Sequence, residues 1–192
     1  MIQNQTRSSS DGALLQIETG RLYVTDGGVI ESSTVSGASG DAGAISIDAD
    51  EVVVSRTSPS ETPGFIATAS QAGSLGNGGD IGIDTNTLRL ENGGQISTTA
   101  AGRNAGNLQV DADADVILIG DDGGLNPSGL FSRALASSNG TSGAITVEAA
   151  RIRVEDGATI SAISSSVGGS GSILLDQGSR CQAFHRVWLA NE

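Results

Sequence analysis

The stretch from Gly143 to Ser161 reads G-A-I-T-V-E-A-A-R-I-R-V-E-D-G-A-T-I-S, and its pattern of apolar residues indicates the fold. Apolar residues stand at every second position in two runs, Ile145–Val147 and Ile152–Val154, and a third run surrounds Ile160. Such alternation is typical of β-strands with one buried face. An Asp-Gly pair before the third run favours a tight turn, because glycine accepts positive φ easily and Asx side chains cap their own backbone. The stretch therefore predicts three short strands.

The same sequence pattern recurs along nearly the whole chain. Each copy opens with an apolar pair, and a glycine lies two positions before that pair in all copies but the first. The pairs are Leu15 and Ile17, Ile45 and Ile47, Ile81 and Ile83, Leu108 and Val110, Ile145 and Val147, and Ile173 and Leu175. Coils are therefore expected to start near residues 12, 43, 79, 106, 143 and 171, and long and short units alternate.

Three short strands in each unit, with no helical segment between them, predict an all-β fold of the β-solenoid class. One unit cannot bury its own apolar face, but stacked units bury continuous columns of Ile, Val and Leu. We expect five full coils and a partial sixth over residues 11–178, a polar lead at 1–10 and a divergent tail at 179–192. An antiparallel sandwich is the alternative, although it does not explain matching apolar positions in every copy.

The long units replace the tight turn by insertions that read T-S-P-S-E-T-P-G-F-I and D-D-G-G-L-N-P-S-G-L-F. They are predicted to be loops on one flank of the body, each returning to the same third strand. Loops on a rigid scaffold commonly carry recognition. Phe65, Leu130 and Phe131 are therefore candidate surface contacts. The alternative is that these side chains are buried beneath their loops and cover the edge of the core.

An acidic residue follows the first apolar pair of every unit. Stacking would align these acids in a column, where like charges repel and Ca²⁺ could bridge their carboxylates. The candidate ligands are Glu18, Asp48, Asp84, Asp111, Glu148 and Asp176. The alternative is that each acid points into water. Asp111, Asp113 and Asp115 also resemble the start of a calcium loop, but the later ligands of an EF-hand are missing.

No catalytic residue is predicted. Serine is plentiful but no base recurs beside it, and the single histidine, His185, lies outside the coils. Arg151 and Arg153 share a unit with Glu148 and Glu155, a mixture typical of a solvated face. The tail, which also holds Cys181, is interpreted either as a short helical cap or as foreign sequence from a shifted reading frame.

Charge and hydropathy exclude several classes of partner. A net charge of −12 argues against nucleic acid and against anionic lipid. A single cysteine excludes an internal disulfide framework. No apolar run is long enough to be inserted in a membrane, and the first residues show no signal peptide.

Residues 12–30 read G-A-L-L-Q-I-E-T-G-R-L-Y-V-T-D-G-G-V-I and residues 106–120 read G-N-L-Q-V-D-A-D-A-D-V-I-L-I-G. Together with the N-P-S-G-L-F insertion, these units resemble the repeats of filamentous haemagglutinin-like exoproteins of two-partner secretion systems, especially the large cyanobacterial forms. The resemblance covers residues 11–178. It implies a right-handed parallel β-helix in an extracellular adhesin, exported through an outer-membrane partner and contacting host or neighbouring cell surfaces, including their glycans.

The resemblance supplies no catalytic residues and no cofactor. We therefore expect a non-catalytic repeat fragment of a secreted surface adhesin. A carbohydrate-active β-helix enzyme, a polysaccharide lyase or hydrolase, is the alternative, and it would require acids and a base converging on an outer groove.

Overall fold

A computed structural model describes residues 1–124 and 126–178 of the chain, and these residues form strands, turns and loops without a helix. In the described ranges, therefore, no helix could cross a membrane. The strands are β1 (Ile2–Thr6), β2 (Leu15–Val24), β3 (Val29–Thr34), β4 (Ile45–Val54), β5 (Phe65–Ser70), β6 (Ile81–Glu91), β7 (Gln95–Ala100), β8 (Leu108–Ile119), β9 (Gly129–Ala134), β10 (Ile145–Glu155), β11 (Thr159–Ser164) and β12 (Ile173–Gln177). The predicted tail, with Cys181 and His185, lies outside the described residues.

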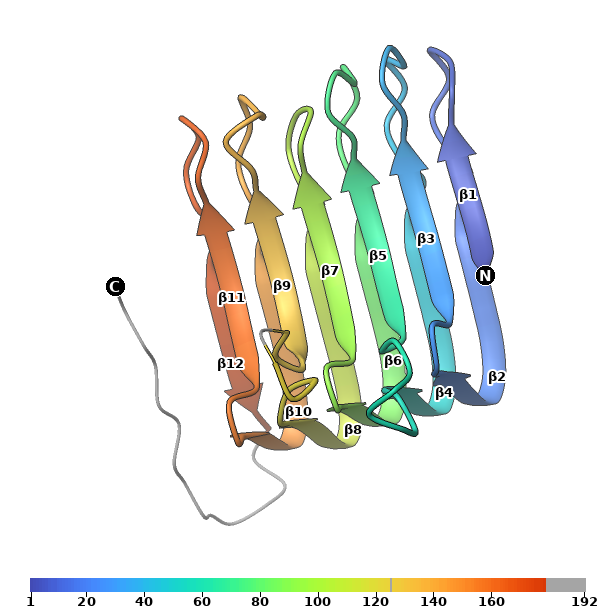
Figure 1. Ribbon diagram of the computed structural model, residues 1–192, viewed down its shortest axis with the longest axis vertical. Coiled ribbons are helices and arrows are strands. Elements are labelled where there is room, and N and C mark those ends of the chain that lie inside the picture. Colours follow the sequence, from blue (N-terminus) through green and yellow to red (C-terminus); the bar gives the residue numbers. More distant parts are fainter. Residues whose placement is uncertain (125, 179–192) are drawn as a thin grey trace.

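The strands form two six-stranded sheets, one of odd-numbered and one of even-numbered strands, stacked in chain order (Figure 1). The chain changes sheet after every strand, and neighbouring strands of a sheet always run parallel. The antiparallel sandwich is therefore wrong. An all-β fold with parallel sheets is confirmed.

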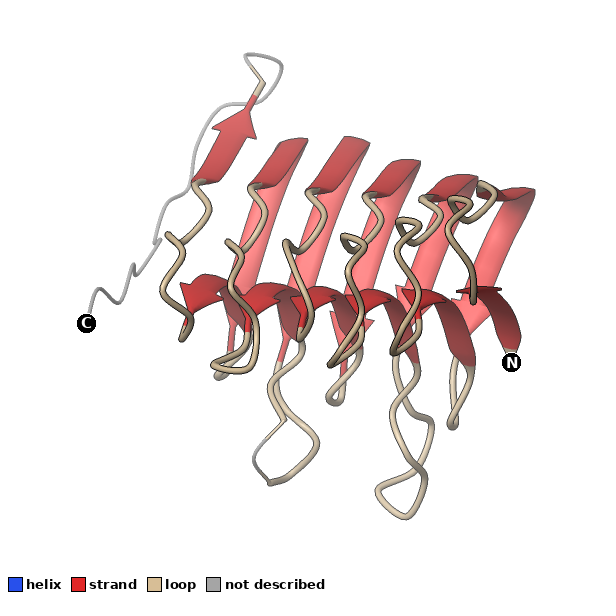
Figure 2. Ribbon diagram, turned by 90° about the horizontal axis from the view of Figure 1, so that it is seen from above, coloured by secondary structure: helices blue, strands red, loops and turns tan. Residues whose placement is uncertain are grey.

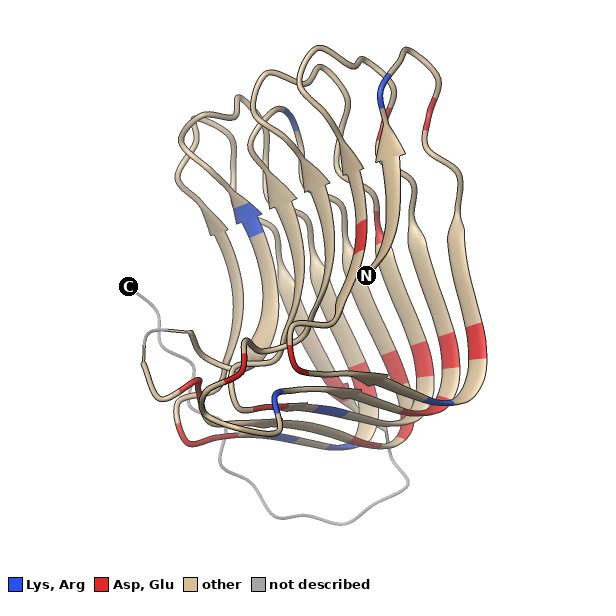
Figure 3. Ribbon diagram, turned by 45° about the vertical axis from the view of Figure 1, so that its right-hand side comes forward, with Lys and Arg blue, Asp and Glu red and all other residues tan. Residues whose placement is uncertain are grey.

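The two short runs predicted at the start of each unit form one continuous strand. In β4 the buried positions are Ile45, Ile47 and Ala49 in the first half, and Val52 and Val54 in the second. Buried positions thus recur at every second residue within each half of the strand, but the step from Ala49 to Val52 is three residues. Both halves can face the interior because the even strands bend there (Figure 3). β8 is one residue longer than its neighbours and takes up the extra residue as a bulge at the bend.

Residues 2–6, predicted to belong to a lead outside the coils, form β1 and pair with β3 from Ile2↔Ile30 to Thr6↔Thr34. The ordered body therefore starts before residue 11. The strand was missed because its sequence, I-Q-N-Q-T, has one aliphatic residue and no preceding glycine.

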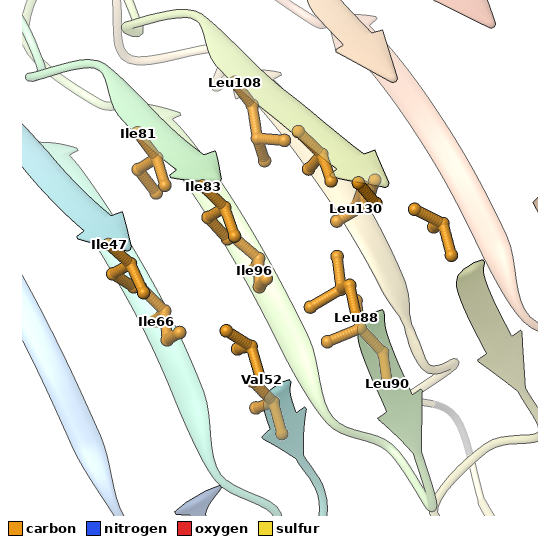
Figure 4. Packing of buried hydrophobic residues seen from close by; sticks show 14 of the residues in the cluster. Ile47, Val52, Ile66, Ile81, Ile83, Leu88, Leu90, Ile96, Leu108 and Leu130 are labelled. Carbon is orange, nitrogen blue, oxygen red and sulfur yellow. The ribbon is translucent and has the colours of Figure 1, made fainter. Parts of the chain in front are cut away.

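The interior between the sheets holds aliphatic columns (Figure 4). One column, here called the odd-strand column, comes from the first residue of β1 and the second residue of every later odd strand, and β7 contributes Ile96, which is fully buried. Its other members are Ile2, Ile30, Ile66, Leu130 and Ile160. Burial of such side chains is the main source of stability in a stacked fold.

Hydroxyl groups replace aliphatic side chains further along the odd strands, where the chain crosses to the next even strand. Thr68 Oγ1 donates to Gly79 O at 2.5 Å, Gly143 N donates to Ser132 Oγ at 2.7 Å, and Thr98 Oγ1 donates to Ser132 Oγ at 3.0 Å. Unpaired polar groups are costly inside a protein, so such hydroxyl groups need partners there. The first two bonds hold crossover loops on the body, and the third joins β7 to β9.

The glycine before each apolar pair packs against the backbone of the preceding unit. A Cβ placed on Gly79 would lie 2.2 Å from Gly43 O, one on Gly106 2.0 Å from Gly79 O, and one on Gly143 2.0 Å from Gly106 O. These glycines, together with Gly171 on Gly143, form a column that we call the glycine column. The spacing between units at this edge has no room for a side chain.

Candidate functional site

The two insertions, residues 55–64 and the described parts of 120–128, project from the same side of the body (Figure 2). They follow β4 and β8, and the strands after them, β5 and β9, lie on either side of β7. Only the short turn between β6 and β7 separates them along the stack. The insertions therefore frame a common outer surface, with β5 and β7 as its floor.

Arg56 links the two insertions. Its Nη1 donates to Pro59 O at 2.9 Å within the first insertion, and its Nη2 donates to Asp122 O at 2.5 Å in the second. The second insertion is also held to the intervening turn, because Gly93 N donates to Ser128 Oγ at 2.9 Å. Sequence analysis missed Arg56, because its partner lies 66 residues away and no motif marks the pair.

Two aspartates order the insertions, Asp26 from the turn between β2 and β3 and Asp122 from within the second insertion. Asp26 Oδ1 accepts from Thr57 N at 2.8 Å, and this backbone bond lowers the pKa of Asp26. Asp122 accepts from the Asn126 side chain at 2.5 Å and from Gly124 N at 3.0 Å, and the Asn126 bond is the main cause that lowers the pKa of Asp122. Both carboxylates are thus stabilised in the charged form by groups of the loops.

Acid is expected to loosen both insertions. A carboxyl group whose pKa is lowered by folding stabilises the fold above its ordinary pKa, here 3.8, and loses that contribution as the pH falls through the lower folded value. Amide chemical shifts of Thr57 and Gly124, followed by NMR from neutral to acidic pH, should titrate with midpoints below 3.8. Asp26→Asn should abolish the transition at Thr57 alone, whereas midpoints at or above the ordinary value would contradict the prediction.

A groove of about 240 Å³ lies between the insertions. Its lining residues are Thr62, Pro63, Gly64, Phe65, Ala67, Gly93, Gln95, Ser97 and Asn126. Phe65 is 37% exposed, so it presents an aromatic face to this groove. The lining combines this ring with amide and hydroxyl groups, the mixture used to bind small polar ligands with an apolar face.

Leu130 and Phe131, the other two candidate contacts, are buried, at 0% and 3% exposure, and are not available as surface anchors. Register explains the difference between Leu130 and Phe65. Ile66, Ile96 and Leu130 are successive members of the odd-strand column, whereas Phe65 is aligned with Gly129. The Phe131 ring is covered by the guanidinium of Arg133, 4.1 Å from its centroid.

The six candidate calcium ligands lie in one continuous column along the first half of the even strands (Figure 3). Each is paired in register with the next, and all are exposed. No group of three or more acidic, histidine or cysteine side chains within the described residues is arranged to hold a metal ion. The column is thus a row of neighbouring charges without a metal-binding cluster.

Neutralising the middle of this column is expected to stabilise the fold. Asp84 has a carboxylate on each side at the strand spacing of about 4.8 Å, and like charges directly opposite destabilise a sheet. Asp84→Asn should raise the free energy of unfolding by about 0.2–1 kcal/mol. Urea denaturation at low and high salt measures this, and the gain should shrink in high salt because screening weakens the repulsion.

The control for that measurement is Asp176→Asn. Asp176 is the last member of the column and pairs with Glu148 on one side. Its substitution should give a smaller gain than Asp84→Asn. Equal gains, or gains that do not depend on salt, would show that repulsion along the column does not contribute to stability.

The mixed patch of arginines and acids consists of ion pairs on the second half of the even strands. Arg151 binds Asp115 through two bonds of 2.6 and 2.7 Å, and Arg153 binds Glu155 at 3.0 and 2.7 Å. The bond from Arg151 is the main cause that lowers the pKa of Asp115. Asp115 is therefore turned toward Arg151 and not toward a calcium loop with Asp111.

Among the predicted site residues, the structure brings together the acids of the column and leaves only Phe65 at the groove between the insertions. Comparisons of the chain with protein-family models, with curated proteins and with solved structures found no match. Function is therefore inferred from the geometry of the body and its insertions.

Proposed function

We propose that the two sheets are walls of a right-handed parallel β-helix of five full coils and a partial sixth. The strict alternation of the chain between the sheets supports this, because each odd and even strand together complete one circuit. Right-handed crossovers account for about 98% of connections between parallel strands, which favours that hand. A crystal structure tests both the handedness and the number of coils.

We further propose that the chain is a non-catalytic repeat fragment of a secreted surface adhesin of the filamentous haemagglutinin-like type. The full-length protein would be exported through an outer-membrane partner and act outside the cell on host or neighbouring cell surfaces, including their glycans. The observation that carries this proposal is a uniform stacked body from which two mutually braced insertions project. Such a body suits a stalk, and a contact surface on loops suits adhesion.

Binding of the fluorescently labelled chain to cells, measured by flow cytometry, tests the adhesive role. Phe65→Ala removes the exposed ring from the groove and should lower the bound signal several-fold, since aromatic side chains dominate contact energy. Asp48→Asn, on the acid column of the other sheet, is the matched control and should bind as the unaltered chain does. Binding at background level, or equal binding by both variants, would contradict the proposal.

The same preparation can test the enzyme alternative. Incubation with a panel of polysaccharides should release neither unsaturated products nor new reducing ends. Release of either would replace the adhesive proposal by a β-helix lyase or hydrolase.

A further inference from the structure

The crossover loops at the opposite edge of the body differ in length. The loops before β6 and β10, residues 71–80 and 135–144, have ten residues each, whereas the loop before β8, residues 101–107, has seven. The short loop therefore lies between two taller ones (Figure 1). A groove of about 560 Å³ opens above it, lined by Gly73, Ser74, Leu75, Gly102, Arg103, Asn104, Ser137, Asn139 and Gly140.

We call this groove the notch. Hydrogen bonds between neighbouring loops and strands hold its floor in place. Arg103 N donates to Ser70 Oγ at 2.9 Å, and Ser137 Oγ donates to Ala101 O at 3.1 Å. The Asn104 side chain bridges the neighbouring units, donating to Asn77 Oδ1 at 3.0 Å and accepting from Thr141 N at 3.0 Å. The notch is thus formed before any ligand arrives, which lowers the entropy cost of binding.

Arg103 differs from the other arginines of residues 1–124 and 126–178. The others pair with an acid, with Gln5, with backbone carbonyls or with the Phe131 ring. The guanidinium of Arg103 has no such partner among the described residues, although the chain carries 22 acidic residues. The guanidinium group of Arg103, which is permanently charged and has five N–H donors, is therefore available to a ligand at the notch.

The remaining lining sets the kind of ligand that would fit. Asn139 and Ser137 offer small polar groups, several glycines leave backbone accessible, and Leu75 presents a side chain that is 59% exposed. The net charge of −12 repels polyanions over a long range, so a single isolated anionic group is favoured over a chain of them. A guanidinium matches a carboxylate through two parallel hydrogen bonds.

We propose that the notch binds a carboxylate-bearing sugar, a uronic acid unit within a glycan. Arg103 takes the carboxylate, Asn139 and Ser137 face the hydroxyl groups, and Leu75 contacts the apolar C–H face of the ring. A peptide C-terminus also offers one carboxylate, but the mostly polar lining favours a ligand that carries several hydroxyl groups. The site is separate from the insertions and does not depend on the adhesive role proposed above.

Titration of the whole chain with glucuronic acid, followed by NMR of backbone amides, tests the site. Shifts should concentrate at residues 102–104 and 137–140, and glucose, which lacks the carboxylate, should bind about tenfold or more weakly. Arg103→Ala should weaken glucuronic acid binding about tenfold or more, and Arg103→Lys should restore part of the affinity, because lysine keeps the charge without the guanidinium group. Arg21→Ala, at an exposed arginine paired with Glu51, should leave binding unchanged.

Thermal melting of Arg103→Ala verifies that the variant folds, since an exposed side chain without a partner should not affect stability. Equal affinity of glucose and glucuronic acid, or unchanged binding after Arg103→Ala, would overturn the proposal. Tighter binding of inorganic phosphate or of an acetylated dipeptide than of glucuronic acid would replace the sugar by that ligand. None of these outcomes bears on cell binding through Phe65, so the two proposals can fail separately.

Discussion

Gly106→Ala is expected to lower the free energy of unfolding by about 3 kcal/mol, near the upper end of the usual cost of overpacking. The new Cβ would lie 2.0 Å from Gly79 O and 2.3 Å from Gly79 C, well inside van der Waals contact with backbone atoms. Backbone cannot move aside as the end of a side chain can. The two units must therefore separate locally, which weakens the hydrogen bonds between β6 and β8 on one side of the glycine column.

Gly82→Ala is the matched control, because Gly82 lies in the neighbouring strand β6 and an added Cβ would have open space around it. Its φ is not among the positive values of the chain, so alanine adopts the same backbone without strain. This substitution should raise stability by about 0.4–1 kcal/mol, since alanine restricts the unfolded chain. Urea denaturation measures both variants, and losses of similar size would show that the glycine column is not closely packed.

The period of these glycines was visible in the sequence, but its physical reason was not. Gly79, Gly106 and Gly143 marked the start of each predicted coil, and the fold class followed from them together with the apolar pairs. The close approach of Gly106 to Gly79 depends on the distance between stacked backbones, which no local pattern encodes. Sequence therefore located the column without revealing that a side chain is excluded there.

The register of the strands determines which side chains after the insertions are buried, and the sequence alone did not reveal it. Phe65 and Leu130 both follow an insertion, and β5 and β9 enter the sheet in register, but Phe65 is the first residue of its strand and Leu130 is the second residue of its own. One residue moves a side chain from the interior to the surface, because successive residues of a strand face opposite sides. The column of acids was predictable because each acid keeps a constant distance from the apolar pair of its own unit.

The notch depends on a difference between loops and not on a motif. Residues 101–107 are unremarkable by themselves, and they form a groove only because the loops on either side are longer. Arg103 also carries no sequence signal, since its lack of a partner is a property of the folded chain. Sites of this kind are found by comparing neighbouring units of a stack after the structure is known.

The odd-strand column should show how stability varies along the stack. Ile96 occupies the middle of that column and is fully buried, with Ile66 and Leu130 as its neighbours. Ile2 occupies the same position in β1, has a neighbour on one side and is 50% exposed. Ile96→Ala is expected to cost about 3–5 kcal/mol, from lost burial and from the cavity left behind, whereas Ile2→Ala should cost less than about 1 kcal/mol.

Urea denaturation followed by circular dichroism measures this pair, and hydrogen exchange locates the change. In a quasi-one-dimensional fold each unit contacts only its neighbours, so Ile2→Ala should increase exchange in β1 and β3 alone. Ile96→Ala interrupts the middle of the stack and should increase exchange in the strands on both sides of β7. Similar losses for the two variants would mean that the interior is not a column of nearest-neighbour contacts, because burial at the two positions differs so widely.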